Sequence, residues 1–210
     1  MSQPILSILI CTLPERRESF EKLYRELGEQ RRILADLGFI KFSEVVLIFD
    51  PAERGEKTIG AKSNDLKRKA DGQYIMRIDD DDMVAPHFLK LIIEGCRTGK
   101  DIITFDFNYF VDGNYLKTMV VNRFLPDGNN HCSKLWAVNY NHTHRFTISD
   151  SHYHLMAVKK ELADQVDFID ANNAEDVEYS KALIPLIKTE YHIEHALLNV
   201  FFSTTKTQNV

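Results

Sequence analysis

Blocks of apolar residues alternate with amphipathic stretches through the first half of the chain. Short runs rich in Val, Ile and Leu predict buried strands over residues 5–10, 45–49, 74–78 and 101–107. Apolar residues at helical spacing predict helices between them, over residues 15–37, 59–70 and 86–96. Strands of this composition, separated by helices, predict an α/β fold with a mostly parallel central sheet flanked by helices.

Within the first predicted helix, one apolar face is expected, formed by Leu23, Leu27, Ile33, Leu34 and Leu37. The second half of the chain is less regular. A hairpin turn is predicted around Gly113, and residues 155–166 mix strand and helix character. Residues 175–187 predict a helix interrupted by a proline, and residues 191–202 predict a final strand.

Four consecutive aspartates, Asp79 to Asp82, follow directly after the third predicted strand. Ligands of parallel sheets bind beyond the carboxyl ends of the strands, and clustered oxygens suit hard divalent cations such as Mg²⁺ and Mn²⁺. An acidic run can also be a solvated loop, and Asp82 could cap the helix that begins near Pro86. Asp50 ends the second strand, so we expect it to line the same crevice.

Composition narrows the classes of function. The net charge of −5 argues against a broad nucleic-acid-binding surface. Three cysteines without paired spacing fit reduced thiols. No window approaches the roughly 18 uninterrupted apolar residues of a membrane span, and the N-terminus lacks the basic region of a signal peptide. We therefore expect a cytoplasmic protein without a membrane span. One local basic cluster stands out: Lys57, Lys62, Lys67, Arg68 and Lys69.

Seven of the eight histidines lie after residue 130. The pairs His142/His144 and His152/His154 have the spacing at which strand residues share a face, so they could form a zinc site. The alternative is a polar pocket lining or ordinary surface packing. Two aromatic residues of the same segment could stack on a sugar or base, or belong to the core: Trp136 and Tyr140.

An ordered series of motifs resembles one known family. The series comprises Thr12 to Arg16 after the first strand, Asp50, Gly60 to Leu66, Ala70 to Ile75, the run Asp79 to Asp82, and a later Glu175-Asp176. It resembles a family 2 glycosyltransferase with the GT-A fold, a Rossmann-like nucleotide-diphospho-sugar transferase fold. The resemblance implies one domain over residues 1–210, with a nucleotide-sugar-binding half at 1–108 and an acceptor-binding half at 109–202. In one departure, Lys62 and Asn64 are separated by Ser63, where the family often has Arg-Asn.

The resemblance also implies roles for the acidic residues. The DXD motif of the family corresponds to Asp79-Asp80-Asp81. Asp81 would bind a divalent cation, Mn²⁺ or Mg²⁺, directly. Asp79 would contact the sugar, the ribose or the metal through water, and Asp80 would belong with the nucleotide-sugar contacts. Asp176 would be the general base, although an acid at this place could also be a first-turn residue favoured by the helix dipole.

Further residues would complete the nucleotide and metal sites. Thr12 and Arg16 would clasp the nucleotide, and Asp50 would hydrogen-bond the base. Lys62 could reach a phosphate. Other readings stay open: a turn residue for Asp50 and solvated helix residues for Arg16 and Lys62. His192, in preference to His195, would be a third protein ligand of the metal, or it would be an ordinary partly buried histidine.

The expected activity is metal-dependent transfer of a sugar from a nucleotide sugar, most often a UDP-sugar in this family, to an acceptor hydroxyl with inversion. The acceptor could be a glycan, a small molecule or a hydroxylated DNA base. Two alternatives remain. A nucleotidyltransferase usually has a glycine-rich basic loop after the first strand, and residues 11–16 contain no glycine. A non-catalytic module that binds metal or carbohydrate would use the aspartates or the histidines.

Overall fold

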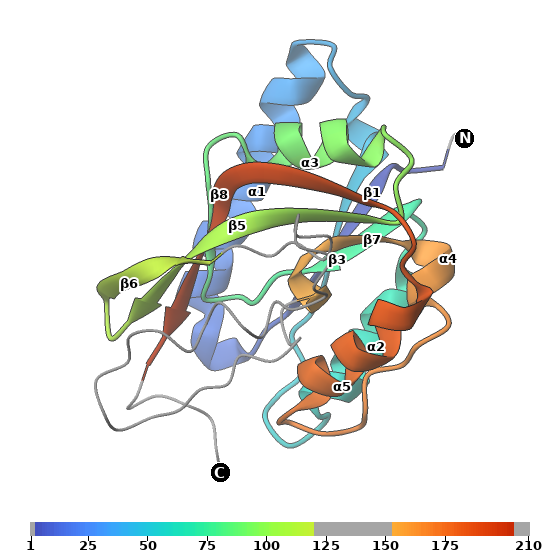
Figure 1. Cartoon of the computed structure of the whole chain (residues 1–210). Helices are drawn as coiled ribbons and strands as arrows, with labels where there is room; N and C mark the ends of the chain where they lie inside the picture. The colour runs from blue at the N-terminus through green and yellow to red at the C-terminus, as the bar shows by residue number, and fades with distance from the viewer. Residues whose placement is uncertain (1–2, 120–152, 204–210) are drawn as a thin grey trace.

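A twisted eight-stranded sheet forms the centre of the fold (Figure 1). The fold is seen in a computed structural model that describes residues 3–119 and 153–203. The strand order is β2-β1-β3-β7-β5-β8-β4, and β6 pairs with the outer part of β5. The strands are β1 (Leu6–Cys11), β2 (Val45–Asp50), β3 (Tyr74–Arg77), β4 (Met83–Val84), β5 (Ile102–Val111), β6 (Asn114–Met119), β7 (Ala157–Lys159) and β8 (Glu190–Phe202).

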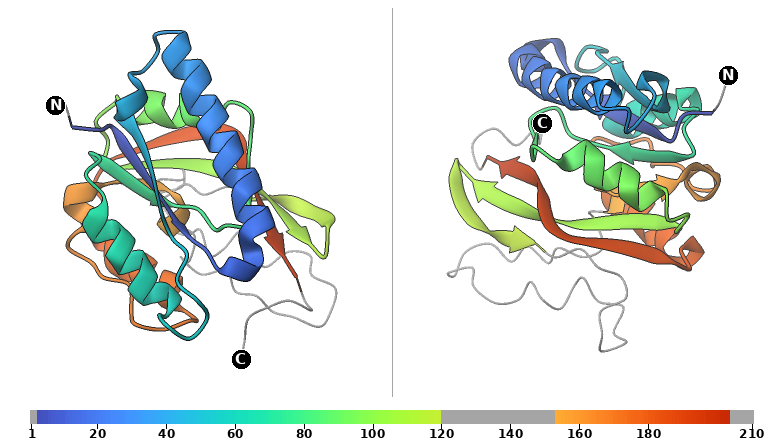
Figure 2. Two further views of the ribbon diagram at one scale, coloured as in Figure 1. Left: turned by 180° about the vertical axis from the view of Figure 1, so that it is seen from behind. Right: turned by 90° about the horizontal axis from the view of Figure 1, so that it is seen from above.

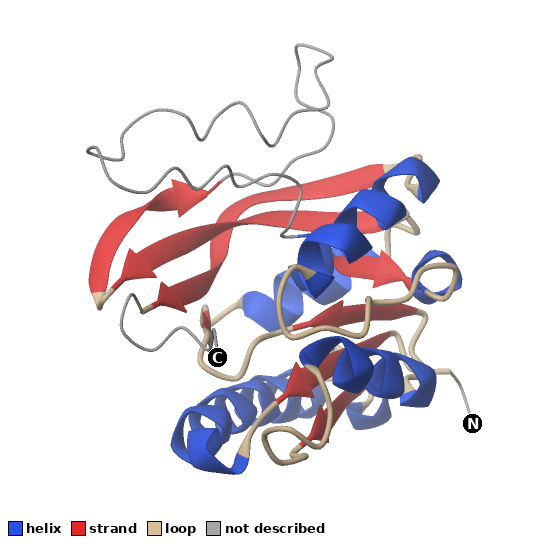
Figure 3. Cartoon of the chain, turned by 90° about the horizontal axis from the view of Figure 1, so that it is seen from below, coloured by secondary structure: helices blue, strands red, loops and turns tan. Residues whose placement is uncertain are grey.

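Helices cover both faces of this sheet. On one face α1 packs against α3, and on the other α2 lies beside α5 (Figures 1 and 2). The helices are α1 (Arg17–Asp36), α2 (Ile59–Lys69), α3 (Phe88–Cys96), α4 (Lys160–Ala163) and α5 (Glu175–Leu183). The β5–β6 hairpin and the end of β8 project past the helices (Figure 3). No helix among the described residues is long and apolar enough to cross a membrane.

The α/β class and most of the predicted elements are confirmed, but the sheet is mixed. β1 is parallel to β2 and β3, and β5 is parallel to β8. β7 is antiparallel to both β3 and β5 and joins the two parallel groups. With three residues, β7 is too short for its pattern to indicate a direction. The division of the chain into two functional halves stays a prediction.

The predicted apolar face of α1 is partly wrong. Leu23, Leu27 and Leu34 are buried, whereas Ile33 and Leu37 are exposed. Gln30 is buried in the helix instead, where its side chain donates to the carbonyl of Ala85 and accepts from the amide of Leu89. This polar contact ties α1 to the start of α3, close to the four aspartates.

Helix α2 holds the segment that leads into α5 in place by hydrogen bonds. Asn64 exchanges two hydrogen bonds with the backbone of Phe168, at 2.8 and 2.9 Å. Gly60 donates to the carbonyl of Ala171, and the amide of Ile59 donates to the side chain of Asn172. These contacts set the position of residues 168–174, which end at the first turn of α5.

Gly60 offers a direct test of this close approach. A β-carbon on Gly60 would lie 1.8 Å from the carbonyl oxygen of Ile169, so the segment would have to move. We expect Gly60→Ala to destabilise the fold by about 1–3 kcal/mol. Gly28→Ala is the matched control, because Gly28 lies in the middle of α1 with open space around it. It should stabilise the fold by up to about 1 kcal/mol. Urea unfolding measures the change in the free energy of unfolding for both variants. If the two changes have the same sign, the close approach of residues 169–171 to α2 does not determine the effect of Gly60→Ala.

Candidate functional site

A pocket of about 880 Å³ lies at the carboxyl ends of β1 and β3. The loop after β1 forms one wall, and the loop before α5 with the first turn of that helix forms another. The ends of β5 and β8 close a third side, through Tyr109, Asp112 and Gly113 and through residues 200–203. This is the edge at which the sequence places the four aspartates, and all four line the pocket.

The four aspartates alternate between the pocket and the protein interior. The side chains of Asp79 and Asp81 are 43% and 38% exposed and face the pocket. Asp80 and Asp82 are each 2% exposed. The four residues form a turn, in which the amide of Asp82 donates to the carbonyl of Asp79 at 3.1 Å, and this turn divides the carboxylates into two pairs. The sequence analysis chose the same two, Asp79 and Asp81, as the main ligand-binding residues.

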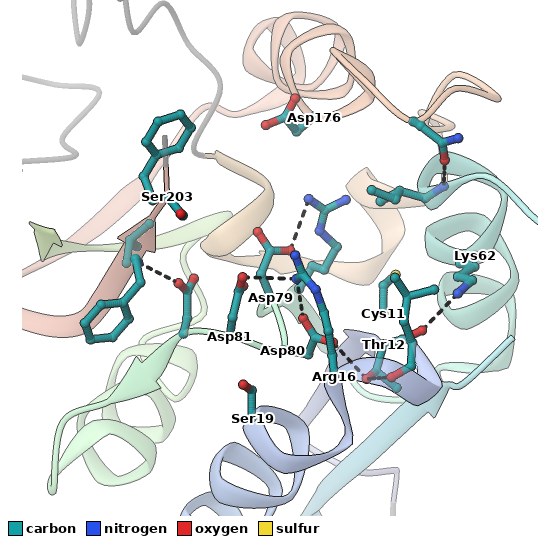
Figure 4. Close-up of a pocket in the computed structure, with 18 of the residues that line it drawn as sticks. Cys11, Thr12, Arg16, Ser19, Lys62, Asp79, Asp80, Asp81, Asp176 and Ser203 are labelled. Carbon is teal, nitrogen blue, oxygen red and sulfur yellow. Dashed lines mark hydrogen bonds and ion pairs between the residues drawn. The ribbon is translucent and has the colours of Figure 1, made fainter. Parts of the chain in front are cut away.

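Asp80 anchors the cluster to the loop after β1. One of its oxygens accepts from the Thr12 hydroxyl at 2.8 Å, and the other from the Arg16 guanidinium at 2.8 Å. Arg16 also forms an ion pair with Asp81 at 3.0 Å. These contacts hold the acidic loop to the loop after β1, and the nucleotide contacts expected of Thr12, Arg16 and Asp80 stay predictions. Figure 4 shows this bridge from Thr12 to Arg16 beside the pocket.

Asp82 does not cap the following helix. One of its oxygens accepts from the backbone amide of Phe201 at 3.2 Å, which fixes the end of β8 to the acidic loop. The other oxygen is buried and has no hydrogen-bond partner within the described part of the chain. Burial, together with the charges of Asp79 and Asp81, raises the pKa of Asp82 well above the ordinary aspartate value.

The pocket-facing pair fits a divalent cation that is completed by a substrate. Mg²⁺-type sites typically use one or two carboxylates, with substrate phosphates and water as the remaining ligands. Across residues 3–119 and 153–203, no three His, Cys, Asp or Glu side chains are placed to hold a metal by themselves. Burial raises the pKa of Asp81 to about 6, an effect that Arg16 reduces. A cation beside Asp79 and Asp81 would relieve the repulsion between these carboxylates.

Lys62 and Asp50 make contacts within the protein, and their expected roles in ligand binding stay predictions. Lys62 is 3% exposed, and its ammonium donates to the carbonyls of Thr12, at 2.9 Å, and Ala52. It therefore joins the loops after β1 and β2, and a phosphate would have to compete with both carbonyls. Asp50 does not line the pocket. It accepts from the amide of Ala52 and pairs with Lys57, as a turn residue does.

The basic cluster of α2 and the loop before it is not an open cationic surface. Lys67 is 2% exposed and donates to two carbonyls of residues 163–166 and to Asp167. Lys57 and Arg68 both pair with Asp65. These charges are used within the fold, so the cluster gives no support for nucleic-acid binding.

Asp176 lies across the pocket from the aspartates, in the first turn of α5 (Figure 4). One of its oxygens accepts from the amide of Val177 at 2.8 Å. Burial raises the pKa of Asp176, whereas the charge of Arg77 lowers it. The preceding residue, Ala174, has a φ of 62°. This left-handed conformation is costly for alanine and persists only where the surrounding structure determines it.

Arg77 is a site residue that the sequence analysis missed. It lies within the buried strand β3 and lines the pocket, although its side chain is 4% exposed. It pairs with Asp79 at 3.4 Å and with Glu175 at 3.2 Å. One signal was available: an arginine within an apolar strand is almost never fully buried unless it is paired.

The histidine predictions fare differently. His192 hydrogen-bonds Thr104 and is not among the described residues that line the pocket, and its role as a metal ligand stays a prediction. Its partner on β5 is five residues, or roughly 17 Å, before pocket-lining Tyr109. His154 is buried and lines the pocket. The other residues of the zinc and stacking hypotheses lie outside the described residues: Trp136, Tyr140, His142, His144 and His152.

A sequence model of glycosyl transferase family 2 matches residues 48–167, which is more than half of the chain. The chain belongs to glycosyl transferase family 2. The matched region begins in β2 and includes the acidic loop, β5 and β7. The family predicted from the ordered motifs is thereby confirmed. No curated protein sequence matches the chain.

Solved structures of TarS from S. aureus share the GT-A fold. Residues 1–349 of TarS in complex with UDP-GlcNAc align with a TM-score of 0.61 and 12% identity, over 94% of this chain and 58% of that one. The complex with UDP aligns with a TM-score of 0.59 and 13% identity, over 95% of this chain and 61% of that one. The chain therefore spans less than two thirds of these TarS chains. At this identity the likeness shows the fold alone.

Proposed function

We propose that the chain transfers a sugar from a nucleotide-diphosphate sugar to an acceptor hydroxyl with inversion. One observation carries this proposal: Asp176 faces the pocket from the side opposite the exposed pair Asp79 and Asp81 (Figure 4). A displacement at the anomeric carbon needs a base on the acceptor side and a charge-stabilising site on the leaving-group side. The pocket has a carboxylate for the first and a carboxylate pair suited to a cation for the second.

In the proposed reaction, the acceptor oxygen forms a bond to the anomeric carbon as the bond from that carbon to the diphosphate breaks. Asp176 takes the proton that the acceptor hydroxyl loses. Asp79 and Asp81 would hold a divalent cation, which supplies positive charge against the departing diphosphate. Arg16, Thr12 and Asp80 keep the acidic loop in place throughout, because their contacts are internal to the protein.

A UDP-sugar is the proposed donor. Support comes from the family and from the two TarS structures with UDP-GlcNAc and UDP, whose fold this chain shares. A glycan, a small molecule and a hydroxylated DNA base stay open as acceptors. The DNA base has the least support, because the ion pairs and buried contacts of α2 use its basic residues.

A thermal-shift panel tests the donor proposal. UDP-, GDP-, CMP- and TDP-sugars would each be added with Mn²⁺ and with EDTA. A ligand at a hundredfold excess over its Kd should raise Tm by about 5–10 °C. We expect UDP-sugars to give the largest shift, with EDTA abolishing it. No shift with any nucleotide sugar would overturn the proposal, and a shift with Mn²⁺ alone would favour a non-catalytic metal-binding module.

A further inference from the structure

Arg77 is a buried side chain that contacts both the acidic loop and helix α5, the two parts of the proposed site. Its guanidinium pairs with Asp79, which faces the pocket, and with Glu175, the first residue of α5. It also donates to the Ser63 hydroxyl on α2 at 3.1 Å. β3, α2 and α5 therefore converge on one buried side chain.

Glu175 depends on this arginine. The glutamate is 5% exposed, and burial raises its pKa, while the positive charge of Arg77 lowers it. A buried carboxylate without a cation would be strongly disfavoured in its charged form. The pairing keeps the first residue of α5 against β3, one position before the proposed base.

Aromatic packing adds a second connection to α5. Arg77 lies over the ring of Phe168, at 5.4 Å from the centroid. Phe168 stacks in turn on Tyr179 of α5, with centroids 3.9 Å apart and planes 5° from parallel. The guanidinium thus contacts α5 directly at Glu175. It also reaches Tyr179, one turn further along the helix, through the ring of Phe168.

We propose that Arg77 is a positioning residue that sets the helix carrying Asp176 against the donor-side carboxylate Asp79. This inference rests on the proposed function. The planar guanidinium has five donors in a fixed arrangement, so it contacts Asp79, Ser63 and Glu175 together. A lysine would supply one point charge in their place. The placement of the base relative to the leaving-group site therefore depends on the shape of Arg77 as well as on its charge.

Arg77→Lys tests the proposal, because it keeps the charge and loses the shape. Turnover of the UDP-sugar that the wild type uses fastest should fall about 100-fold, the size expected for a misplaced catalytic group. The Kd for UDP with Mn²⁺ should change by much less than turnover, because the lysine keeps a positive charge beside Asp79 while the position of the base is lost. Amide hydrogen exchange of residues 174–180 should become about tenfold faster.

Lys67→Met is the matched control. Lys67 is another buried cation, and it holds residues 163–167 by carbonyl contacts without touching Asp79 or Glu175. Its loss should lower Tm while leaving turnover and the exchange of residues 174–180 near the wild-type values. If Lys67→Met reproduces the whole Arg77→Lys pattern, general destabilisation explains it and the proposal is wrong.

Glu175→Gln supplies a second variant in case Arg77→Lys fails to fold. Glu175→Gln weakens the ion pair with Arg77, whereas the contacts of Arg77 with Asp79 and Ser63 remain. Turnover should therefore fall by about tenfold, which is less than in Arg77→Lys. Adding Glu175→Gln to Arg77→Lys should cost nothing further, because both act through one contact. Fully additive losses, or unchanged exchange and turnover in Arg77→Lys, would overturn the inference. The exchange measurement needs no substrate, so it tests Arg77 even if no nucleotide binds.

Discussion

Asp176→Asn should reduce sugar transfer about 1,000-fold, within the range for a positioned general base. The amide cannot accept the proton of the acceptor hydroxyl, yet its oxygen can still accept from the amide of Val177. Nucleotide binding should be retained, because Asp176 lies across the pocket from Asp79 and Asp81 (Figure 4). UDP release from the UDP-sugar measures turnover, and calorimetry with UDP and Mn²⁺ measures binding.

Glu178→Gln provides the control for this prediction. Glu178 belongs to the same first turn of α5, but it pairs with Lys181 at 2.8 Å and does not line the pocket. Its neutralisation changes the local charge by the same amount and should leave turnover nearly unchanged. If Asp176→Asn retains wild-type turnover, or if Glu178→Gln loses as much, Asp176 is not the base.

The pH profile gives an independent check on Asp176. A general base works only in its ionised form, so turnover must fall as the pH is lowered through its pKa. Burial raises the pKa of Asp176 and the charge of Arg77 only partly opposes this. The midpoint at which kcat falls on the acid side should therefore lie above the pKa of an ordinary aspartate. The residual activity of Asp176→Asn should not show this fall. An identical limb in both proteins would assign it to another group.

The sequence predicted the fold well wherever one local pattern decided the structure. The long strands and the helices α1, α2 and α3 each have an apolar periodicity that survives in the structure. The direction of β7 depends on pairing with strands far away in the sequence, which no local pattern records. Ile33 and Leu37 were placed on the buried face of α1 but are exposed, whereas the polar Gln30 belongs to the buried face.

The sequence predicted the position of the candidate site, but it did not predict the hydrogen bonds and ion pairs that site residues form with partners distant in the sequence. The resemblance to the DXD motif singled out Asp79 and Asp81, and in the structure these two side chains are more exposed than those of Asp80 and Asp82. The contacts of Lys62 with Thr12 and of Arg16 with Asp80 could not be predicted from a local pattern, because these partners lie 50 and 64 positions away. Arg77 was missed for the same reason, since Glu175 is 98 positions away.

Asp81→Ala should abolish the effect of Mn²⁺ on nucleotide binding. A change in a residue that merely supports a metal ligand typically costs 10–100-fold in affinity, so loss of a direct ligand should cost at least about 100-fold. Arg16 would still be held by Asp80, at 2.8 Å, so the loop after β1 should keep its place. Calorimetry with UDP, with and without Mn²⁺, measures the change, and the same titration on Asp79→Ala should also show weaker binding.

Asp82→Asn tests whether Mn²⁺-dependent binding needs a particular metal-binding carboxylate or only the net negative charge of the acidic loop. Asp82 belongs to the same acidic run, but it is turned inward, and its oxygen accepts from the amide of Phe201. Because burial raises its pKa, an amide resembles the neutral form that the buried side chain prefers. Mn²⁺-dependent binding should therefore survive in Asp82→Asn and disappear in Asp81→Ala. Equal loss in both variants would mean that the net charge of the loop, rather than the pocket-facing carboxylates, attracts the cation.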